Sequence, residues 1–368
     1  MAAVYSATDT HLKQLVYQHI LTVEQFTPEV LEALFGLAQR MDRQVETGHG
    51  DLLLTNRVIA NAFYEPSTRT DLSFQSATQR LGGRVISTAG GVQYSSVTKG
   101  ESLHDTIKTI ACYADAIVLR HPVRGAAREA AEAADALRMS LHRPTPIINA
   151  GDGTGEHPTQ ALLDLYTIKD RFGANIDGLT IGFLGDLRNG RTVHSLIKLL
   201  AIDHCHVKVV CIAPESLSMP SEYVEFARSR EMPVEETQDL QEAIGDLDVL
   251  YVTRVQRERF VAQEMEDLAA KVYGMPVDGL DAQRKDALRP LAEQNAAQEY
   301  LAARDTYVVD PMMLSQAQKN MILLHPLPRV NEIPEAVDTD DRAYYFRQVQ
   351  NGLYIRMALL ASVLNCLR

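Results

Sequence analysis

Short apolar runs alternate with helix-like segments along most of this chain, and no other feature constrains its fold as strongly. Runs of this kind are typical of strands that are buried on both faces of a parallel sheet. Helices between such strands cover the two faces, and right-handed crossovers then fix much of the topology. The predicted strands are Val58–Phe63, Ala116–Leu119, Pro146–Asn149, Leu179–Leu184, Val207–Ala213, Val249–Val252 and Met321–Leu324.

A chain of 368 residues is too long for one compact core of the commonest size. We therefore predict an α/β fold with two doubly wound parallel-sheet domains. An amphipathic helix is expected over Thr22–Met41, and a helix that joins the two halves over His157–Arg171. A long last helix, over about Asp341–Leu367, should pack on a core. The stretch Val261–Asp305 gives few periodic signals; it is either a functional loop or a solvated helical insertion, and we favour the insertion.

The net charge of the chain limits its partners. The formal net charge is −12 at pH 7, which argues against binding to nucleic acid or to an anionic lipid surface. Small anions are not excluded, because salt screens charges over roughly 8–10 Å and a local arginine cluster can still bind an anion. The longest apolar run, Met357–Leu364, is too short to span a bilayer. The sequence therefore predicts no nucleic-acid partner and no membrane association.

The cysteines and the first residues of the chain indicate its cellular compartment. None of the four cysteines forms a C-x-x-C pair, which is typical of reduced thiols in a cytosolic protein. His204 and His206 flank Cys205, and we favour a chance arrangement over a zinc site. Met1–Gln14 lacks the charged start and apolar core of a signal peptide. We expect a cytoplasmic protein without a metal or other cofactor; a transit peptide removed from a longer precursor stays open.

The segment Ser67–Thr70 ends an apolar run and begins a helix-like stretch. Pro66 stops the strand, Ser67 is a good N-cap residue, and apolar residues follow at helical spacing until Gly82. A helix N-terminus binds anions through its unpaired N–H groups and its dipole, and the donor fork of Arg69 matches phosphate geometry. The motif suits a doubly charged phosphate, and an ordinary capped helix with a surface arginine is the alternative.

Polar clusters follow six of the predicted strands directly. Ligands of open parallel sheets sit outside the carboxyl ends of the strands, so these clusters together predict one composite anion site. The clusters are Glu65–Thr70, Arg120–Pro122, Asn149–Gly153 with His157 and Gln160, Asp186–Arg191, Arg254–Gln256 and His325–Arg329.

The charges in these clusters indicate the chemistry. Arg69 and Arg120 could neutralise a phosphate, and Arg191 and Arg254 could hold carboxylates. His157 could donate a hydrogen bond to a carbonyl oxygen, transfer a proton, or simply bond to the backbone. The sequence shows no nucleophile elbow and no Walker A loop. The site is therefore expected to position and polarise its substrates rather than to form a covalent bond with them.

With these motifs the chain resembles the catalytic chain of the aspartate carbamoyltransferase family. Their order and spacing match nearly everywhere from about His19 to the C-terminus, which is far more specific than any single motif. The matching stretches are Phe63–Thr70, Lys99–Ser102, Arg120–Pro122, His157–Gln160, Gly185–Asp186, Gly190–Ser195, Thr253–Gln256 and His325–Val330.

The resemblance implies carbamoyl transfer from carbamoyl phosphate to L-aspartate, which yields N-carbamoyl-L-aspartate and phosphate for de novo pyrimidine synthesis. It implies a carbamoyl-phosphate domain over residues 1–156 and 343–368. An aspartate domain would cover residues 157–342, with a linking helix at 157–172 and a long insertion at 261–305. The family works as a homotrimer with shared active sites, and regulatory chains or a multienzyme assembly stay open.

Site roles follow from the same resemblance, position by position. The phosphate would be bound by Ser67, Thr68, Arg69 and Thr70. The carbonyl oxygen would be reached by Thr70, Arg120 and His157, and the carbamoyl NH₂ would be held by Gln160 and the backbone of Leu327. The aspartate carboxylates would be bound by Arg191, Arg254 and Gln256. The neighbouring subunit's site would receive Ser95 and the catalytic Lys99; both would bind carbamoyl phosphate, and Lys99 would also bind aspartate. Domain closure would involve Glu65, Arg259 and the Glu258–Arg254 pair.

Three features depart from the family pattern. Asp71 stands where arginine is common, and this carboxylate suits the helix dipole but weakens the local positive field. Asn189 stands where an aromatic residue is usual. Val261–Asp305 is longer than the family's loop over aspartate, which puts closure and aspartate affinity in question but not the reaction.

Two other functions fit the motifs less well. An ornithine or other amino-acid carbamoyltransferase usually has a cysteine in its His-Cys-Leu-Pro motif, where this chain has Pro326. The segment Arg254–Gln256 also suits a dicarboxylate better. A non-catalytic family member that acts as a binding partner is opposed by the intact Arg69, Lys99 and His157.

Overall fold

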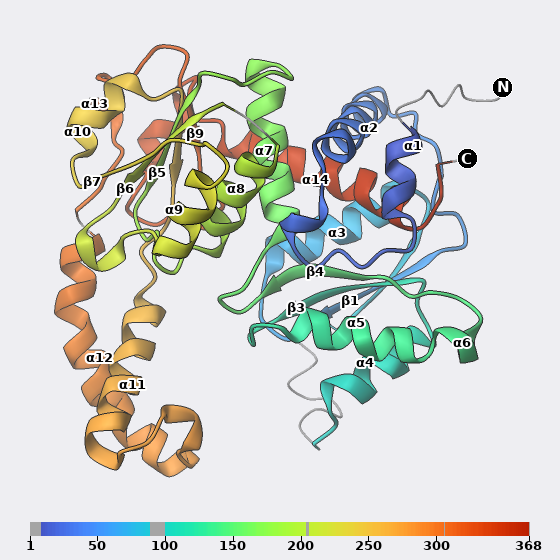
Figure 1. Ribbon diagram of the computed structural model, residues 1–368, viewed down its shortest axis with the longest axis horizontal. Helices are drawn as coiled ribbons and strands as arrows, with labels where there is room; N and C mark the ends of the chain where they lie inside the picture. The colour runs from blue at the N-terminus through green and yellow to red at the C-terminus, as the bar shows by residue number, and fades with distance from the viewer. Residues whose placement is uncertain (1–8, 89–99, 204–205, 305, 368) are drawn as a thin grey trace.

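Two parallel sheets organise the chain. The computed structural model describes residues 9–88, 100–203, 206–304 and 306–367. One sheet has four strands in the order β2-β1-β3-β4, and the other has five in the order β7-β6-β5-β8-β9, with every pair parallel. Figure 1 shows the first sheet on the right and the second on the left, each with helices on both faces. The predicted α/β fold with two doubly wound parallel-sheet domains is confirmed.

All seven predicted runs form strands, and the apolar pattern misses two others. Both missed strands, β2 and β7, lie at a sheet edge, where one side of the strand is not covered. Glu235 and Glu236 in β7 are exposed, so this strand has no continuous apolar run. The strands are β1 (Val58–Phe63), β2 (Arg84–Ser87), β3 (Ala116–His121), β4 (Ile147–Asp152), β5 (Thr180–Leu184), β6 (Lys208–Ile212), β7 (Val234–Thr237), β8 (Val249–Val252) and β9 (Ile322–Leu324).

The α-helices of the described residues cover the faces and join the strands. They are α1 (Asp9–Leu12), α2 (Pro28–Thr47), α3 (Thr68–Arg80), α4 (Leu103–Ala111), α5 (Ala126–Ala136), α6 (Arg138–Leu141), α7 (Pro158–Phe172), α8 (Arg191–Ile202), α9 (Ser221–Arg228), α10 (Leu240–Ala243), α11 (Arg257–Tyr273), α12 (Ala282–Arg304), α13 (Pro311–Leu314) and α14 (Tyr345–Val363).

Two predicted helix boundaries are wrong. The expected helix at 22–41 begins only at Pro28, because Thr27 caps it there by accepting from the N–H of Val30. The residues before it form a short 3₁₀ turn. The last helix begins at Tyr345 rather than near 341, because Ala343 forms a parallel bridge to Leu323 of β9 and is held extended.

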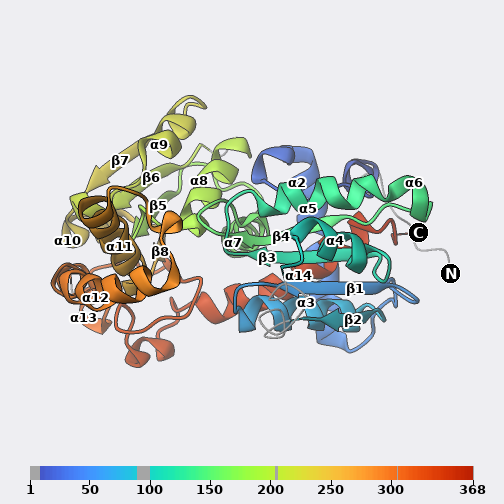
Figure 2. The ribbon, with the colours of Figure 1, turned by 90° about the horizontal axis from the view of Figure 1, so that it is seen from below.

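Alternate residues of β1 show how the first sheet is buried. Ile59 and Phe63 face the large core that α2, α3 and α14 share, whereas Ala60 and Ala62 face a smaller core under α4 and α5. Figure 1 places α4 and α5 below this sheet, and Figure 2, seen from below, places them in front of it. Burial on both faces explains why the run carries so few polar residues.

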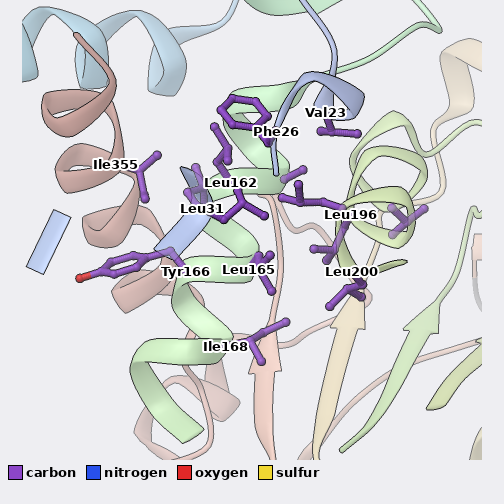
Figure 3. Packing of buried hydrophobic residues seen from close by; sticks show 14 of the residues in the cluster. Val23, Phe26, Leu31, Leu162, Leu165, Tyr166, Ile168, Leu196, Leu200 and Ile355 are labelled. Atoms are coloured by element: carbon purple, nitrogen blue, oxygen red, sulfur yellow. The ribbon is translucent and has the colours of Figure 1, made fainter. Parts of the chain in front are cut away.

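Helix α7 runs through the largest core and joins the two halves. Figure 3 shows Leu162, Leu165 and Ile168 of α7 among side chains from α2, α8 and α14. Tyr166 of the same helix is 1% exposed and contacts Phe35 of α2 with ring centroids 5.6 Å apart. A helix so tightly enclosed fixes the side chains at its N-terminus with respect to both sheets.

The described part of the predicted insertion, residues 261–304, is mostly helical, as the favoured interpretation predicts. Helices α11 and α12 form a hairpin that extends away from the second sheet at the lower left of Figure 1. A small apolar core lies between them, made by Met265, Leu268, Ala269, Leu280, Leu288 and Ala292. The weak periodic signal of α12 follows from this slender hairpin, which buries few residues.

Among the helices of the described residues, none is both long and apolar enough to cross a membrane. In the same part of the chain, no three His, Cys, Asp or Glu side chains are grouped so that they could hold a metal ion.

Candidate active site

One cleft collects the predicted site residues from the carboxyl ends of β1, β3, β4, β5, β8 and β9. Its volume is about 930 Å³, and residues of both halves line it. The predicted residues in its walls are Glu65, Ser67, Thr68, Arg69, Thr70, Arg120, His157, Gln160, Arg191, Arg254, Gln256, Glu258, Arg259 and Leu327. Ser95 and Lys99 lie outside the described residues, so their placement stays a prediction.

The start of α3 forms one wall of the cleft. Ser67 precedes the helix with φ −155° and ψ 81°, and within the described residues its side chain makes no cap hydrogen bond. The Ser67 hydroxyl instead donates to Thr70 Oγ1 at 3.1 Å. The N–H groups of the first turn therefore have no side-chain acceptor at this position, which leaves them available to an anion.

Arg120 and Arg191 lie side by side against the carboxyl end of β4, where the chain begins to turn. Arg120 Nη1 donates to the carbonyl of Ala150 at 3.1 Å, and Arg191 Nη1 donates to that of Gly153 at 2.7 Å. Gly151 between them has φ +115°, and a Cβ there would lie 3.0 Å from Arg120 Nη1 and 3.2 Å from Arg191 Cζ. Only glycine therefore fits this turn with both guanidinium groups in place.

Glu65 joins the two arginines. Its Oε2 lies 3.0 Å from Arg120 Nη2 and 3.4 Å from Arg191 Nη2. One carboxylate thus contacts a cation at the end of β3 and another at the start of α8. Glu65 is the group that would have to exchange contacts if a substrate anion bound to either arginine.

The guanidinium groups raise the positive potential in one another's surroundings. Burial and the charge of Arg191 lower the pKa of Arg120 to about 10, although Glu65 acts in the opposite direction. Burial and Arg254 lower the pKa of Arg69. Arginine stays protonated at such values, so the repulsion persists and an anion placed between these groups is stabilised.

The loop after β9 closes the cleft against α3. The carbonyl of Leu327 accepts from Arg69 Nη2 at 2.6 Å, and the N–H of Leu327 donates to Nδ1 of His325 at 2.7 Å. Because Nδ1 accepts, Nε2 of His325 carries the proton that is shared with Glu332 Oε1 at 2.9 Å. The backbone at Leu327, predicted to hold the carbamoyl NH₂, is thereby fixed next to the predicted phosphate ligand.

His157 is buried at the start of α7, where it is 4% exposed. Its backbone N–H donates to Ser195 Oγ at 3.1 Å, which ties α7 to α8. Burial, Arg191, Arg120 and Arg356 lower its pKa well below 6.5. The imidazole is therefore neutral near pH 7, so it can donate a hydrogen bond to an oxygen without adding a charge.

A histidine titration should show this directly. We expect the ¹⁵N shifts of the His157 ring to stay constant from pH 5.5 to pH 8, because the folded protein opposes its protonation over that range. The measurement is an ¹⁵N NMR titration of the labelled protein, with a His157→Gln variant to assign the signals. A midpoint near the ordinary value of about 6.5 would contradict the burial and charge argument.

Two of the residues predicted to bind aspartate, Arg254 and Gln256, follow β8. Arg254 Nη2 lies 3.5 Å from Oε1 of Glu258, four residues further along the chain, and the Glu258 side chain is 68% exposed. An ion pair this exposed contributes little, roughly 0–1 kcal/mol, so Arg254 can exchange it for another carboxylate at small cost. Arg259 and Gln256 line the same wall.

The hydrogen bonds of Asp71 and Asn189 show what these two departures from the family pattern do in the structure. Asp71 is 8% exposed and accepts from Asn61 Nδ2 at 2.7 Å and Gln75 Nε2 at 2.8 Å, and it is not among the described residues that line the cleft. Its carboxylate thus bonds to β1 and α3 rather than to a ligand. Asn189 donates from Nδ2 to the buried Asp186 at 3.1 Å, so an amide holds this turn where the family usually has a ring.

Sequence reasoning missed three polar cleft residues: Ser73, Gln348 and Arg356. Arg356 is 4% exposed, donates to Ser73 Oγ at 2.9 Å, and leaves its Nε without a partner among the described residues. A lone arginine in the apolar stretch of the last helix was the available signal. Gln348 does not stand out in sequence, because it lies inside a helix. Thr192, also in the cleft, belongs to the matching stretch Gly190–Ser195, but no role is predicted for it.

Two doubly wound domains line one arginine-rich cleft, whose guanidinium groups suit anionic ligands. The chain belongs to the aspartate/ornithine carbamoyltransferase family: residues 18–170 match the family's carbamoyl-phosphate-binding domain, and residues 177–363 match its Asp/Orn-binding domain.

Individual relatives are similar over nearly the whole chain. The aspartate carbamoyltransferase catalytic subunit of Thermococcus kodakarensis is 45% identical over 349 residues, which cover 95% of this chain and 97% of that protein. The multifunctional protein pyr1-3 of Dictyostelium discoideum is 44% identical over 95% of this chain, which spans only 14% of that protein's length. The aspartate transcarbamoylase structure from Trypanosoma cruzi with carbamoyl phosphate and aspartate has a TM-score of 0.79 at 38% identity, over 96% of this chain and 98% of that chain.

Proposed function

We propose that this chain transfers the carbamoyl group of carbamoyl phosphate to the amino group of L-aspartate. The products are N-carbamoyl-L-aspartate and phosphate, which makes the reaction a step of de novo pyrimidine synthesis. The observation that carries the proposal is the single cleft that gathers Arg69, Arg120, Arg191 and Arg254 from both halves. A dianionic phosphate and a dicarboxylate together need this many cations.

Carbamoyl phosphate would bind against the start of α3. Its phosphate would accept from the side chains of Ser67, Thr68 and Arg69 and from the free N–H groups of the first turn. Its carbonyl oxygen would accept from Thr70, Arg120 and His157. Leu327 and Gln160 would hold the NH₂ group at the other end.

Aspartate would bind from the second half of the chain. Its two carboxylates would be bound by Arg191, Arg254 and Gln256, which line the same cleft. Glu65 would release Arg191 as the substrate carboxylate takes its place, and Glu258 would release Arg254. We propose that these exchanges, with Arg259, accompany closure of the two domains.

The chemical step needs orientation and charge stabilisation. The amine nitrogen of aspartate forms a bond to the carbamoyl carbon, and the negative charge that develops on the carbonyl oxygen is stabilised by the three donors of Thr70, Arg120 and His157. The carbon–oxygen bond to phosphate then breaks, and the electron pair leaves with the phosphate next to Arg69. The attacking nitrogen loses one proton, which the departing phosphate takes up to leave as hydrogen phosphate. No covalent bond to the protein is formed.

We propose the domain assignment that the family likeness implies. Residues 1–156 and 343–368 would form the carbamoyl-phosphate domain, and residues 157–342 the aspartate domain with the 261–305 insertion. The packing of α14 against α2 and α3 supports the return of the chain to the first half. We also propose a homotrimer in which Ser95 and Lys99 enter the neighbouring subunit's site. A cytoplasmic location is supported by the free thiols of Cys112, Cys211 and Cys366.

A substrate comparison tests the proposed reaction. We expect purified protein to carbamoylate L-aspartate with a kcat/KM at least about 10³-fold above that for L-ornithine, because Arg254 would repel the second ammonium group of ornithine. The measurement is product formation from carbamoyl phosphate with each amino acid. Preferential carbamoylation of ornithine would establish the other enzyme of the family, and no product from either would favour a binding partner.

A further inference from the structure

A buried carboxylate on the linking helix has no part in the reaction described so far. Asp164 of α7 is fully buried and accepts three hydrogen bonds from side chains. Its Oδ1 accepts from Gln160 Nε2 at 2.9 Å and from Gln348 Nε2 at 2.6 Å. Its Oδ2 accepts from the hydroxyl of Tyr251 in β8 at 2.8 Å. Asp164 therefore joins its own helix α7 to β8 and α14 at one point beneath the cleft.

The polarity of this cluster fixes the orientation of two amide groups. An ionised carboxylate can only accept hydrogen bonds, so each glutamine must direct its NH₂ group at Asp164 and its carbonyl oxygen elsewhere. Gln348 follows this rule, because its Oε1 accepts from the N–H of His325 at 2.9 Å. Gln160 lines the cleft, so its Oε1 is the atom of the amide that remains for a ligand.

We propose that Asp164 is a positioning residue that orients the Gln160 amide so that its carbonyl oxygen accepts a hydrogen bond from the NH₂ of the carbamoyl group. The inference rests on the proposed function, because it deepens the role given there to Gln160. The carbamoyl NH₂ is a donor, and a flipped Gln160 would present a second NH₂ to it. Asp164 thus sets the specificity for a carbamoyl group over an acyl group of similar shape.

The same carboxylate also supports the other predicted ligand of the NH₂ group. Gln348, held by Asp164, accepts from the N–H of His325, and Nδ1 of His325 accepts from the N–H of Leu327. Asp164 is therefore connected by hydrogen bonds to both Gln160 and the loop that carries Leu327. Loss of its oxygens should loosen both ligands of the NH₂ group and leave the phosphate ligands on α3 in place.

The charged and titratable groups around Asp164 favour its ionised form at mildly alkaline pH. Burial raises the pKa of Asp164 to about 7, although the bonds from Gln348, Tyr251 and Gln160 and the charge of Arg356 lower it. Burial raises the pKa of Tyr251 well above its usual value, so the phenol remains a donor. Ligand binding to the variants and to the parent protein is therefore measured at pH 8.5, where Asp164 of the parent protein is ionised.

Acetyl phosphate is the probe, because a methyl group replaces the NH₂ and cannot donate. The measured quantity is the ratio of its dissociation constant to that of carbamoyl phosphate. We expect Asp164→Leu, which removes both acceptors, to lower this ratio about tenfold, with the acetyl phosphate constant changed less than about twofold. We expect Asp164→Asn to keep the ratio within about twofold, because its amide oxygen can replace Oδ1.

Tyr251→Phe is the matched control. It removes a hydrogen bond from the same carboxylate, through Oδ2, and leaves both glutamine contacts in place. We expect it to keep the ratio within about twofold. Equal weakening of both ligands by Asp164→Leu would show that the carboxylate only stabilises the fold, and the proposal would be wrong.

Gln160→Met separates this inference from the proposed function. If that variant keeps the parent ratio, the role given to Gln160 is wrong. If it lowers the ratio while Asp164→Leu does not, the inference about Asp164 is wrong and the proposed function stands. Should Asp164→Leu not fold, neutron diffraction on the parent protein locates the Gln160 amide hydrogens. Hydrogens directed at Asp164 support the proposal, and hydrogens directed into the cleft overturn it.

Discussion

Replacement of Arg69 by alanine is expected to lower kcat by on the order of 10²–10³ or more, the loss typical of one removed transition-state donor. Arg69 lies at the start of α3 next to the proposed phosphate, and the negative charge on the phosphate grows as the carbon–oxygen bond breaks. The same side chain donates to the Leu327 carbonyl at 2.6 Å, so its loss also frees the loop after β9. The measurement is steady-state turnover with saturating carbamoyl phosphate and aspartate.

Controls separate the lost charge from lost structure. Arg69→Lys retains a positive charge but cannot form the planar fork, so we expect a kcat between those of the parent and the alanine variant. The side chain of Arg69 is exposed and belongs to no apolar core, so the mass of the assembly and its thermal midpoint should change little. Near-parental turnover of Arg69→Ala, with carbamoyl phosphate still bound, would remove Arg69 from the proposed site.

The apolar pattern predicted most of the fold because buried parallel strands leave little room for polar residues. Strands such as β1 and β8 are covered on both faces and coincide with their apolar runs. Strand β7 has no such apolar run, because Glu235 and Glu236 can face solvent at a sheet edge. The start of the last helix could not be predicted, because Ala343 is held extended by a pairing with β9 that is remote in sequence.

The strand-end rule brought the site together from residues far apart in the chain. Arg69 follows β1 and Arg120 lies at the end of β3, and parallel pairing places the carboxyl ends of these two strands at one edge of the first sheet. Arg254 follows β8 of the second sheet and lines the same cleft. Residues inside helices gave no such signal. Asp164 and Arg356 lie within α7 and α14, where a single polar residue in an apolar stretch is hard to tell from an exposed one without the packing.

Glu65 explains how a cleft this rich in arginine can exist in a folded chain. Like charges in low-dielectric surroundings repel one another, and burial together with the charge of Arg191 lowers the pKa of Arg120 to about 10. The carboxylate of Glu65 contacts both Arg120 and Arg191 and offsets part of the cost. Substrate anions would offset it more completely, so binding energy becomes available for drawing the two halves of the cleft together.

Mixing two inactive variants is expected to restore activity if sites are shared between subunits. Lys99→Ala chains retain Arg69, and Arg69→Ala chains retain Lys99. In a closed trimer, any mixture of the two chains contains one site in which an intact Arg69 meets an intact neighbouring Lys99. Each mixed trimer should therefore show about one third of the parental activity, although both parent variants are nearly inactive.

The experiment requires unfolding and refolding the two variants together, with each variant treated alone as the control. Native mass spectrometry of differently tagged chains measures the fraction of mixed assemblies, so the activity can be given per mixed trimer. Restored activity in proportion to that fraction places Lys99 in the neighbour's site. If mixed trimers form and stay inactive, Lys99 acts within its own chain or not at all, because every such trimer would contain the complementary pair of subunits.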